Sequence, residues 1–279
     1  MKFLVLLLSA IFYLWTASVP LVLYGYSYEC FSRGNFTSIH VLTVDPKEHV
    51  IVPVKANGKK IKRETVRNLA IRHGAIAAIN GGFWKANGAP AGVLKIDSFW
   101  YGTPTKPRGA IGWSHDGQKV IIDQVLTNHS LLDCPEGEEI AVISASTSSD
   151  EWKMLEHIVG GVPVLVRNEA LVQDYSTEET LETFLTKTHS RTAVGIKKSG
   201  EWVFVVVDGR LFGLLGGMSI RALSKLMLEL GCVDALNLDG GSSSTLFVEG
   251  SVMNESYGKI WENGKFVQAV SDAILILDR

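Results

Sequence analysis

The chain has 279 residues, 46% of them hydrophobic, and a formal net charge of −2. This length suits one large domain or two small ones, and the apolar content can supply a sizeable core. The nearly neutral charge, and the lack of a basic run with interleaved aromatic residues, give no argument for nucleic acid or an anionic membrane surface. Nucleic-acid binding is therefore not expected.

The chain begins with an apolar run over residues 3–23, and Lys2 is the only charged residue before Glu29. A basic start followed by an apolar run is typical of a secretory signal or a membrane anchor, and about 20 residues are enough to span a bilayer. A buried N-terminal helix is a third interpretation. Small residues favour cleavage somewhere between Ala17 and Ser27.

We therefore divide the chain into residues 1–28, a signal peptide or an uncleaved anchor, and residues 29–279, the folded domain. The protein would be secreted, periplasmic or associated with the cell envelope, and would contact a membrane only through residues 1–28 if they are retained. Export permits a disulfide, for which Cys30 and Cys134 are the preferred pair, whereas Cys232 is expected to be a buried thiol. The absence of a Cys-x-x-Cys motif argues against a structural zinc site.

Short apolar runs bounded by turn residues predict many strands, after a polar linker over residues 29–35. The predicted strands are 39–44, 50–54, 75–79, 92–96, 110–113, 119–125, 140–144, 162–166, 193–196, 203–207, 235–238 and 269–277. Helical spacing predicts helices at 65–73 and 220–230, and residues 177–184 are either a short helix or a mobile loop. These elements predict a single α+β domain of mixed β-sheets with few helices.

The stretch from Glu201 to Val248 contains two apolar runs that each end in Asp-Gly, with one amphipathic helix between them. Strand, helix and strand at this length predict one right-handed βαβ crossover near the C-terminus, with parallel neighbouring strands. Asp208 and Asp239 would then lie together at the carboxyl ends of these strands, where open sheets place their ligands.

Four polar motifs each lie at an end of a predicted strand: Asn80-Gly81-Gly82, His189-Ser190-Arg191-Thr192, Asp208-Gly209-Arg210 and Asp239-Gly240-Gly241-Ser242-Ser243. A rigid strand end followed by glycine allows a substrate to approach the backbone closely. The carboxylates could act as acid, base or nucleophile, and the arginines could pair with phosphate or carboxylate oxygens. Backbone N–H groups of the last motif could form a concave anion site.

Structural interpretations of the same residues stay open. Asp-Gly is a common turn dipeptide, Asn80 could cap a turn, and Arg191 could pair with an Asp to brace the site. His189 could be a structural histidine or a proton carrier. The three serines lack a nucleophile elbow, so none is expected to be a nucleophile. Three tryptophans could be core residues or could supply flat faces for sugars: Trp84, Trp100 and Trp113.

Five segments extend this pattern: residues 77–84, 160–172, 188–196, 205–210 and 231–246. In this order they resemble the phosphodiester glycosidase family, with similarity over roughly residues 36–279, so that residues 29–279 would form one phosphodiester glycosidase domain. The resemblance implies an exported hydrolase that cleaves the glycosidic bond of a sugar-1-phosphodiester, of the N-acetylglucosamine type. Free sugar and a phosphomonoester would be released, in cell-envelope or exopolysaccharide material.

On this resemblance we assign the catalytic roles to Asp239, Asp208 and His189. The residues expected to bind substrate are Asn80, Gly81, Gly82, Arg191, Thr192, Arg210, Gly240, Gly241, Ser242 and Ser243. The arginines would hold the phosphate, and Asn80 would contact sugar hydroxyls. No cofactor is required, and a bound divalent cation is left open.

The chain departs from the family pattern at Ser190, Ser242 and Ala222, where the family usually has Pro, Gly and Glu. The third change removes a carboxylate near the site and with it a conceivable metal contact. These departures support an alternative, a non-catalytic carbohydrate-binding protein of the cell envelope or exopolysaccharide. A phosphodiesterase that cuts the phosphate side would want a two-metal cluster, which the scattered histidines do not suggest.

Overall fold

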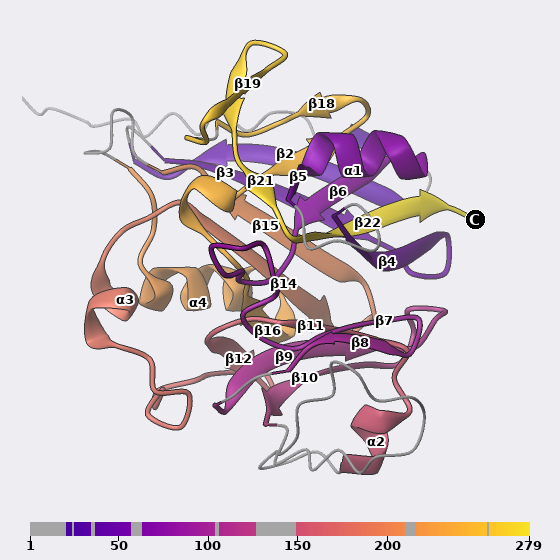
Figure 1. Ribbon diagram of the computed structural model, residues 1–279. Coiled ribbons are helices and arrows are strands. Elements are labelled where there is room, and N and C mark those ends of the chain that lie inside the picture. The colour runs from indigo at the N-terminus through magenta and orange to yellow at the C-terminus, as the bar shows by residue number, and fades with distance from the viewer. Residues whose placement is uncertain are drawn as a thin grey trace, which may run out of the picture.

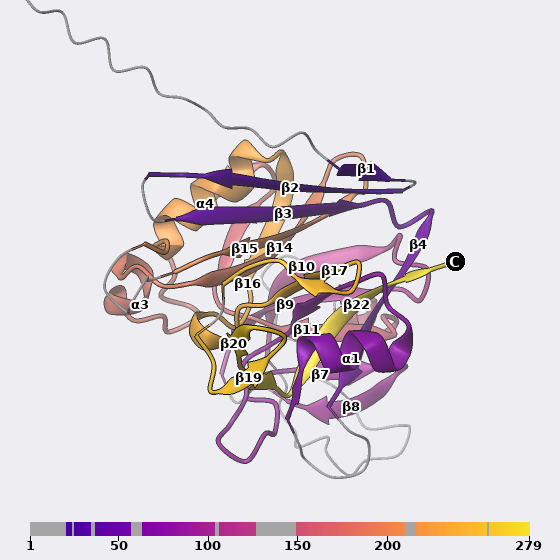
Figure 2. The same ribbon diagram turned by 90° about the horizontal axis from the view of Figure 1, so that it is seen from above.

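The structure is a computed structural model that describes residues 21–23, 25–34, 37–56, 63–103, 106–126, 149–209, 216–255 and 257–279. Strands dominate these residues, and the helices lie around the sheets (Figure 1, Figure 2). The helices are α1 (Val66–His73), α2 (Ser149–Lys153), α3 (Glu182–Thr186), α4 (Ile220–Glu229) and the 3-10 helix η1 (Gly241–Ser243). The expectation of a single α+β domain with few helices is confirmed.

Three large sheets and two small ones make up the strands. The eight-stranded sheet has the order β1 (Leu21–Leu23), β2 (Tyr26–Ser32), β3 (Ser38–Val44), β15 (Trp202–Val207), β14 (Arg191–Lys197), β16 (Cys232–Asn237), β12 (Val164–Arg167), β13 (Ala170–Leu171). One five-stranded sheet has the order β10 (Val120–Val125), β9 (Arg108–Trp113), β11 (His157–Gly160), β7 (Leu94–Ile96), β8 (Phe99–Gly102).

The other five-stranded sheet has the order β18 (Ser251–Val252), β17 (Leu246–Val248), β6 (Ala77–Asn80), β22 (Asp272–Asp278), β4 (His49–Lys55). The two small sheets pair β19 (Ile260–Glu262) with β20 (Lys265–Val267), and β21 (Ala269–Val270) with β5 (Glu64–Thr65). All of these strand pairs are antiparallel.

One central core joins the three large sheets. It takes Leu42 and Phe204 from the eight-stranded sheet, Ile111 from β9, and Ile79 and Ile274 from the sheet of β6 and β22. All five side chains are fully buried, and burial of this kind contributes roughly 1.5–3 kcal/mol for each large apolar side chain. The sheets therefore hold one another in place, and the loops that leave them are fixed where the sheets meet.

Helices cover the outer faces of two sheets. α1 begins at Thr65, whose hydroxyl accepts the Asn68 N–H, and ends at Gly74 in the left-handed conformation at φ 68°. Its buried residues pack on the sheet of β6 and β22, as helical spacing predicts. α4 begins at Ser219, whose hydroxyl accepts the Ala222 N–H, and buries Leu223 and other apolar residues against the eight-stranded sheet.

The crossover differs from its prediction in one respect. β15, α4 and β16 follow one another as expected, but β14 lies between β15 and β16 and is antiparallel to both. The two strands run in the same direction without being neighbours, so the prediction of a neighbouring parallel pair was wrong. The reason is the tight turn at Gly200 (φ 91°), which folds β14 onto β15 as a local hairpin before β16 arrives.

The N-terminal region also differs from its prediction. Residues 29–35 were expected to be a linker, but β2 runs from Tyr26 to Ser32 and pairs with β3 along its whole length. The boundary between residues 28 and 29 therefore falls inside a strand. The expected strand 140–144 and Cys134 lie outside the described residues, and Cys232 is buried, as predicted. Within the described part of the chain, every helix is too short or too polar to cross a bilayer.

Candidate active site

Three of the predicted motifs meet at one edge of the eight-stranded sheet. The carboxyl ends of β15 and β16 flank the start of β14, because β14 is antiparallel to both. The Ser190 carbonyl, just before β14, accepts the Gly241 N–H at 2.8 Å. A Cβ on Gly209 would lie 2.3 Å from the Ser190 nitrogen, and one on Gly240 would lie 2.8 Å from the Ser190 oxygen. Both positions therefore need glycine for close approach of the backbones.

We expect Gly209→Ala to lower the free energy of unfolding by about 1–3 kcal/mol, since the new methyl group would meet backbone atoms that cannot turn aside. Urea denaturation at neutral pH measures the change. Gly92→Ala is the matched control, because its Cβ would have no neighbour nearer than 3.9 Å. Equal stability of the two variants would contradict the close packing of Gly209 on Ser190.

The fourth motif joins this edge from another sheet, through a fully buried Asn80. The Asn80 Oδ1 accepts the Thr192 hydroxyl at 2.9 Å and the Thr245 N–H at 3.1 Å, and Nδ2 donates to the Asp239 carbonyl at 2.7 Å. These bonds tie β6, β14 and the loop after β16 together. Asn80 therefore positions Asp239. Its amide is enclosed and bonded to protein groups, so these contacts give no support to the expectation that it binds sugar hydroxyls.

Asp239 is partly exposed at the centre of this arrangement. Burial raises the pKa of its carboxyl to about 7, against hydrogen bonds from the Ser243 hydroxyl and the Gly240 N–H that favour the charged form. The nearby Asp272 raises this pKa further, and the Trp84 indole lowers it. A carboxyl group at a strand end with a pKa near neutral pH is well suited to proton transfer or to charge stabilisation.

Asp272, the first residue of β22, is a second carboxylate at the site that the sequence motifs do not include. It is 2% exposed; its Oδ1 accepts the Gly82 N–H at 2.8 Å, and its Oδ2 accepts the Ser271 hydroxyl. A Cβ on Gly81 would lie 1.9 Å from Oδ1, so Gly81 makes room for this carboxylate. Burial raises the pKa of Asp272 to about 6. The sequence signal was an Asp interrupting the apolar run 269–277.

Asp208 is not the partner of Asp239. Its Oδ2 lies 3.2 Å from His40 Nε2 on β3, and its Oδ1 accepts the Glu255 N–H at 3.0 Å. β3 lies on the opposite side of β15 from β14, so this carboxylate is turned away from Asp239. With β14 between them, the two strand ends are about 10 Å apart. His40 Nδ1 is in turn 2.8 Å from the Tyr28 hydroxyl. Tyr28 thus holds the His40 ring, which contacts Asp208.

Arg191, predicted to bind phosphate, is bonded to the protein itself. Arg191 is 2% exposed and donates to the carbonyls of Met218, Phe184 and Lys187 at 2.9–3.0 Å. Burial lowers its pKa to about 10. Arg191 therefore braces the backbone, in place of the expected phosphate contact or carboxylate pair. His189, partly buried, is held next to Met218 by two backbone hydrogen bonds.

The glycine-serine loop is likewise folded inward. The Gly240 N–H serves the Asp239 carboxylate, the Gly241 N–H donates to Ser190, and the Ser243 N–H donates to the Gly240 carbonyl at 3.2 Å. Three backbone N–H groups of the expected anion site are therefore bonded within the protein, and one of them, from Gly240, donates to Asp239. Ser242 is the exposed residue of this loop. Arg210 lies outside the described residues.

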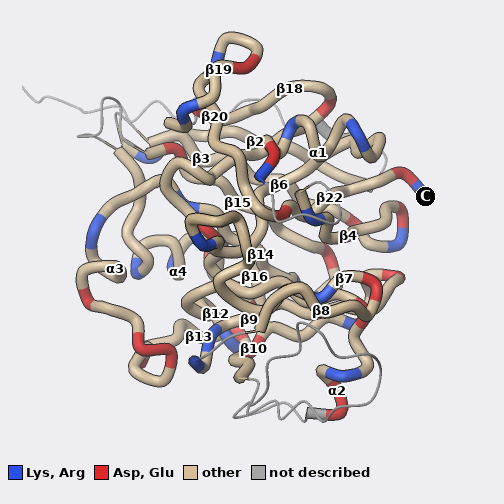
Figure 3. The backbone as a smooth tube through the Cα atoms, viewed as in Figure 1, with Lys and Arg blue, Asp and Glu red and all other residues tan. Residues whose placement is uncertain are grey.

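One tryptophan and one arginine complete the described site. Trp84 is partly exposed, and its indole Nε1 donates to the Ser243 hydroxyl at 3.4 Å. The exposed Arg63 guanidinium lies 4.7 Å from the centre of the Trp84 ring. Trp113, by contrast, is fully buried in the core, so the sugar-stacking interpretation does not apply to it. Figure 3 shows acidic and basic residues interspersed over the described chain.

Metal-binding groups do not gather at this edge among the described residues. Among the described residues, the three side chains that could hold an ion are Asp97, His115 and His157, which lie elsewhere, on the sheet of β7, β9 and β11. Asp239 and Asp272 have Ser, Trp and backbone N–H partners.

Comparison with known proteins gives relatives of two kinds. The chain is 27% identical over 211 residues to an uncharacterized SPbeta prophage-derived protein of Bacillus subtilis, covering 74% of this chain and 29% of that protein. It is 33% identical over 104 residues to N-acetylglucosamine-1-phosphodiester alpha-N-acetylglucosaminidase of Bos taurus, covering 34% of this chain and 19% of the relative. The chain thus spans well under half the length of these curated relatives.

Two solved structures share the fold. A hypothetical protein from Synechocystis superposes with a TM-score of 0.72 at 19% identity, covering 91% of this chain and 62% of the other. The catalytic domain of zebrafish N-acetylglucosamine-1-phosphodiester alpha-N-acetylglucosaminidase, auto-inhibited by its pro-peptide, gives a TM-score of 0.65 at 19% identity, with coverages of 91% and 82%. The family model of phosphodiester glycosidases matches residues 73–277, which include Asp239, Asp272 and the four motifs. The chain therefore belongs to the phosphodiester glycosidase family.

Proposed function

We propose that the protein hydrolyses the glycosidic bond of a sugar-1-phosphodiester, of the N-acetylglucosamine-1-phosphodiester kind. The bond between the anomeric carbon and the phosphate oxygen breaks, and the oxygen of water replaces it on the sugar. The products are the free sugar and a phosphomonoester, which keeps the bridging oxygen. Family membership and the two relatives named as N-acetylglucosaminidases support this reaction class.

The observation that carries the proposal is the state of Asp239. Its carboxyl has a pKa of about 7, is partly exposed, and lies where four family motifs converge. A phosphodiester leaving group is already acidic and needs little proton donation. The carboxylate form of Asp239 therefore acts at the anomeric centre, where it stabilises positive charge or takes a proton from water. Asp272 is buried, accepts the Gly82 N–H and raises the pKa of Asp239.

This assignment predicts the pH profile. Because the pKa of Asp239 is raised to about 7, the active carboxylate forms only as the pH rises through that value. We expect kcat to increase about tenfold for each pH unit below pH 7 and to level off above it. Steady-state rates from pH 5 to 9 test this. A rate that falls as the pH rises through 7 would make Asp239 a general acid.

Arg63 is the described cation best placed for the substrate phosphate, since it covers the ring of Trp84 beside Asp239. We expect Arg63→Gln to raise KM by about 10-fold, the loss of one charge-assisted contact, with a smaller effect on kcat. Arg72→Gln is the control, because that arginine pairs with Glu64 on the outer side of α1. An unchanged KM in Arg63→Gln would remove Arg63 from the site.

The reaction is tested with the full chain and a synthetic α-N-acetylglucosaminyl phosphodiester. Free N-acetylglucosamine and a phosphomonoester support the proposal. N-acetylglucosamine-1-phosphate would move cleavage to the phosphate side and refute it. Sugar binding without turnover would favour the alternative, a carbohydrate-binding protein of the cell envelope or exopolysaccharide. That alternative draws support from Arg191, which is expected to hold phosphate but is occupied by protein carbonyls.

We also propose that the protein is exported, with residues 1–28 containing a signal peptide or an anchor. The strand β2 begins at Tyr26 and pairs with β3, so a cleavage site upstream of Leu21 would leave the sheet intact. Intact-mass measurement of the exported protein decides this. A mature chain that begins after Tyr28 would contradict a folded role for β2, and a full-length chain in the membrane fraction would indicate an anchor.

A further inference from the structure

A second group of polar side chains lies away from the proposed active site. Asp97 follows β7, His115 follows β9 by two residues, and His157 is the first residue of β11. β11 is antiparallel to both β7 and β9, so the ends of those two strands meet the start of β11 at one edge of the sheet. One ligand-type atom of each side chain lies within 4.8 Å of the other two.

His157 is the fixed member of this group. Its side chain is 0% exposed, its Nε2 has no hydrogen-bond partner, and this nitrogen lies 3.8 Å from the Asp97 carboxylate. A buried polar atom left without a partner is costly, and it marks a place where another group can bind. Burial lowers the pKa of His157, as do the nearby His115 and Lys95, against Asp97 and Glu156.

We propose that Asp97, His115 and His157 bind a divalent transition-metal ion of the zinc class. Two imidazoles and one carboxylate are donors that zinc accepts, with water in the fourth position, whereas calcium and magnesium prefer oxygen donors. Ligands of a tetrahedral zinc ion are about 3.3 Å apart, given bonds of about 2 Å. The three atoms must therefore draw together from spacings of up to 4.8 Å, and the exposed Asp97 and His115 have the freedom to do so.

Two features oppose the ion and limit its affinity. His157 Nδ1 accepts the Asp97 N–H at 3.2 Å, which places the proton of the neutral ring on Nε2. Metal binding at Nε2 displaces the proton from that nitrogen, and the neutral ring then carries its proton on Nδ1. The Asp97 N–H can no longer donate to Nδ1, so it has to turn away. The ammonium group of Lys95 is the second opposing feature, since its charge acts on His157. Affinity is therefore weaker than that of a preformed zinc site.

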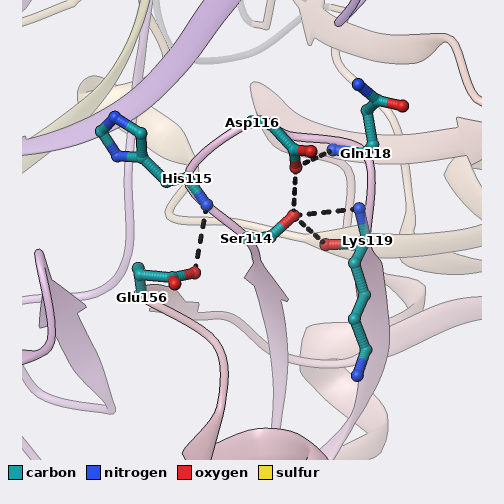
Figure 4. A pocket seen from close by; sticks show the side chains of 6 residues that line it. All are labelled: Ser114, His115, Asp116, Gln118, Lys119 and Glu156. Carbon is teal, nitrogen blue, oxygen red and sulfur yellow. Dashed lines mark hydrogen bonds between the residues drawn. The ribbon is translucent and has the colours of Figure 1, made fainter.

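An open pocket adjoins this group at His115, the proposed ligand that lines it. A pocket of about 630 Å³ is lined by His115, Glu156 and the turn between β9 and β10 (Figure 4). The Glu156 carboxylate accepts the backbone N–H of His115 at 3.1 Å and so fixes this residue on the turn. Figure 4 shows the His115 ring directed away from Asp116 and Lys119. A metal here would link three neighbouring strand ends and stabilise this sheet.

The test is thermal unfolding of the full chain, stripped with a chelator and then titrated with zinc chloride. At a zinc concentration about 100 times Kd we expect Tm to rise by about 5 °C. Cobalt is the spectroscopic probe, because protein nitrogen ligands give it a visible absorption that cobalt in water lacks. Two ligand variants, Asp97→Asn and His115→Gln, are both at exposed positions and should fold normally.

We expect each ligand variant to bind zinc at least about 10-fold more weakly and to lose the cobalt absorption. His73→Gln, which removes an exposed histidine on α1, is the matched control and should respond like the original chain. An equal rise in Tm for all four proteins would show adventitious binding elsewhere, and no rise in the original chain would show no site. Either result overturns the proposal and leaves the proposed hydrolysis untouched.

Discussion

Asp239→Asn is expected to reduce kcat on a sugar-1-phosphodiester by about 10²–10⁴-fold, because an amide can neither take a proton nor carry the negative charge that the anomeric centre requires. The same substitution is expected to stabilise the folded protein at alkaline pH. Asparagine keeps the shape of the side chain without a charge to bury. Its Oδ1 can accept the Gly240 N–H, and the Ser243 hydroxyl can turn to accept a hydrogen bond from the new amide.

The sign of the stability effect follows from the raised pKa. The folded carboxyl has a pKa of about 7, against about 3.9 in the unfolded chain. Between these pH values the folded state holds a proton that the unfolded state releases. The free energy of unfolding therefore carries its full contribution from Asp239 below about pH 4, and this contribution is lost as the pH rises through 7. Linkage over this interval corresponds to at most about 4 kcal/mol at pH 8. The amide also disturbs one of the hydrogen bonds to the carboxylate, so we expect the variant to be more stable by about 1–2 kcal/mol at pH 8, and nearly equal in stability at pH 4.

Turnover and urea denaturation at both pH values test these two effects together. Asp174→Asn is the control, since that exposed residue bonds only to Ser176 in its own turn and should keep full turnover. Loss of activity together with a gain in stability would show that the Asp239 carboxylate is required for turnover although it lowers the free energy of unfolding. Loss of both would instead show that the charged carboxylate holds the loop together.

Asn80→Ala is expected to give the largest loss of stability, about 3–5 kcal/mol. The substitution leaves the Thr245 N–H and the Thr192 hydroxyl without their acceptor and the Asp239 carbonyl without its donor, all in the protein interior. It also frees the backbone of Asp239. We therefore expect kcat to fall as well, even at temperatures where the variant is fully folded.

Urea denaturation gives the stability difference, with the m value as a check that the unfolded state is unchanged. Asn87→Ala is the matched control, because Asn87 lies in an exposed loop and its side chain accepts one local N–H from Ala89. That change should cost no more than about 1 kcal/mol. If Asn80→Ala keeps its stability and loses only sugar affinity, Asn80 binds substrate after all.

The positions of the elements and the four motifs follow from local patterns that the sequence contains in full. Apolar runs, turn residues and helix caps predicted α1, α4 and most of the strands, because each depends on neighbours in the chain. The departure at β2 has the opposite origin, a pairing with another strand. Its polar and aromatic residues have partners on β3, a pairing that the segment 29–35 by itself does not reveal.

Tertiary structure alone decided which side chains act together. The hairpin of β14 and β15 inserted a strand between Asp208 and Asp239, so the second carboxylate beside Asp239 is Asp272, about thirty residues further along the chain. The sequence determined that polar groups stand at the strand ends, since strand and turn patterns are local. It could not determine which donors they meet or how deeply they are buried, because those depend on how three sheets pack against one another.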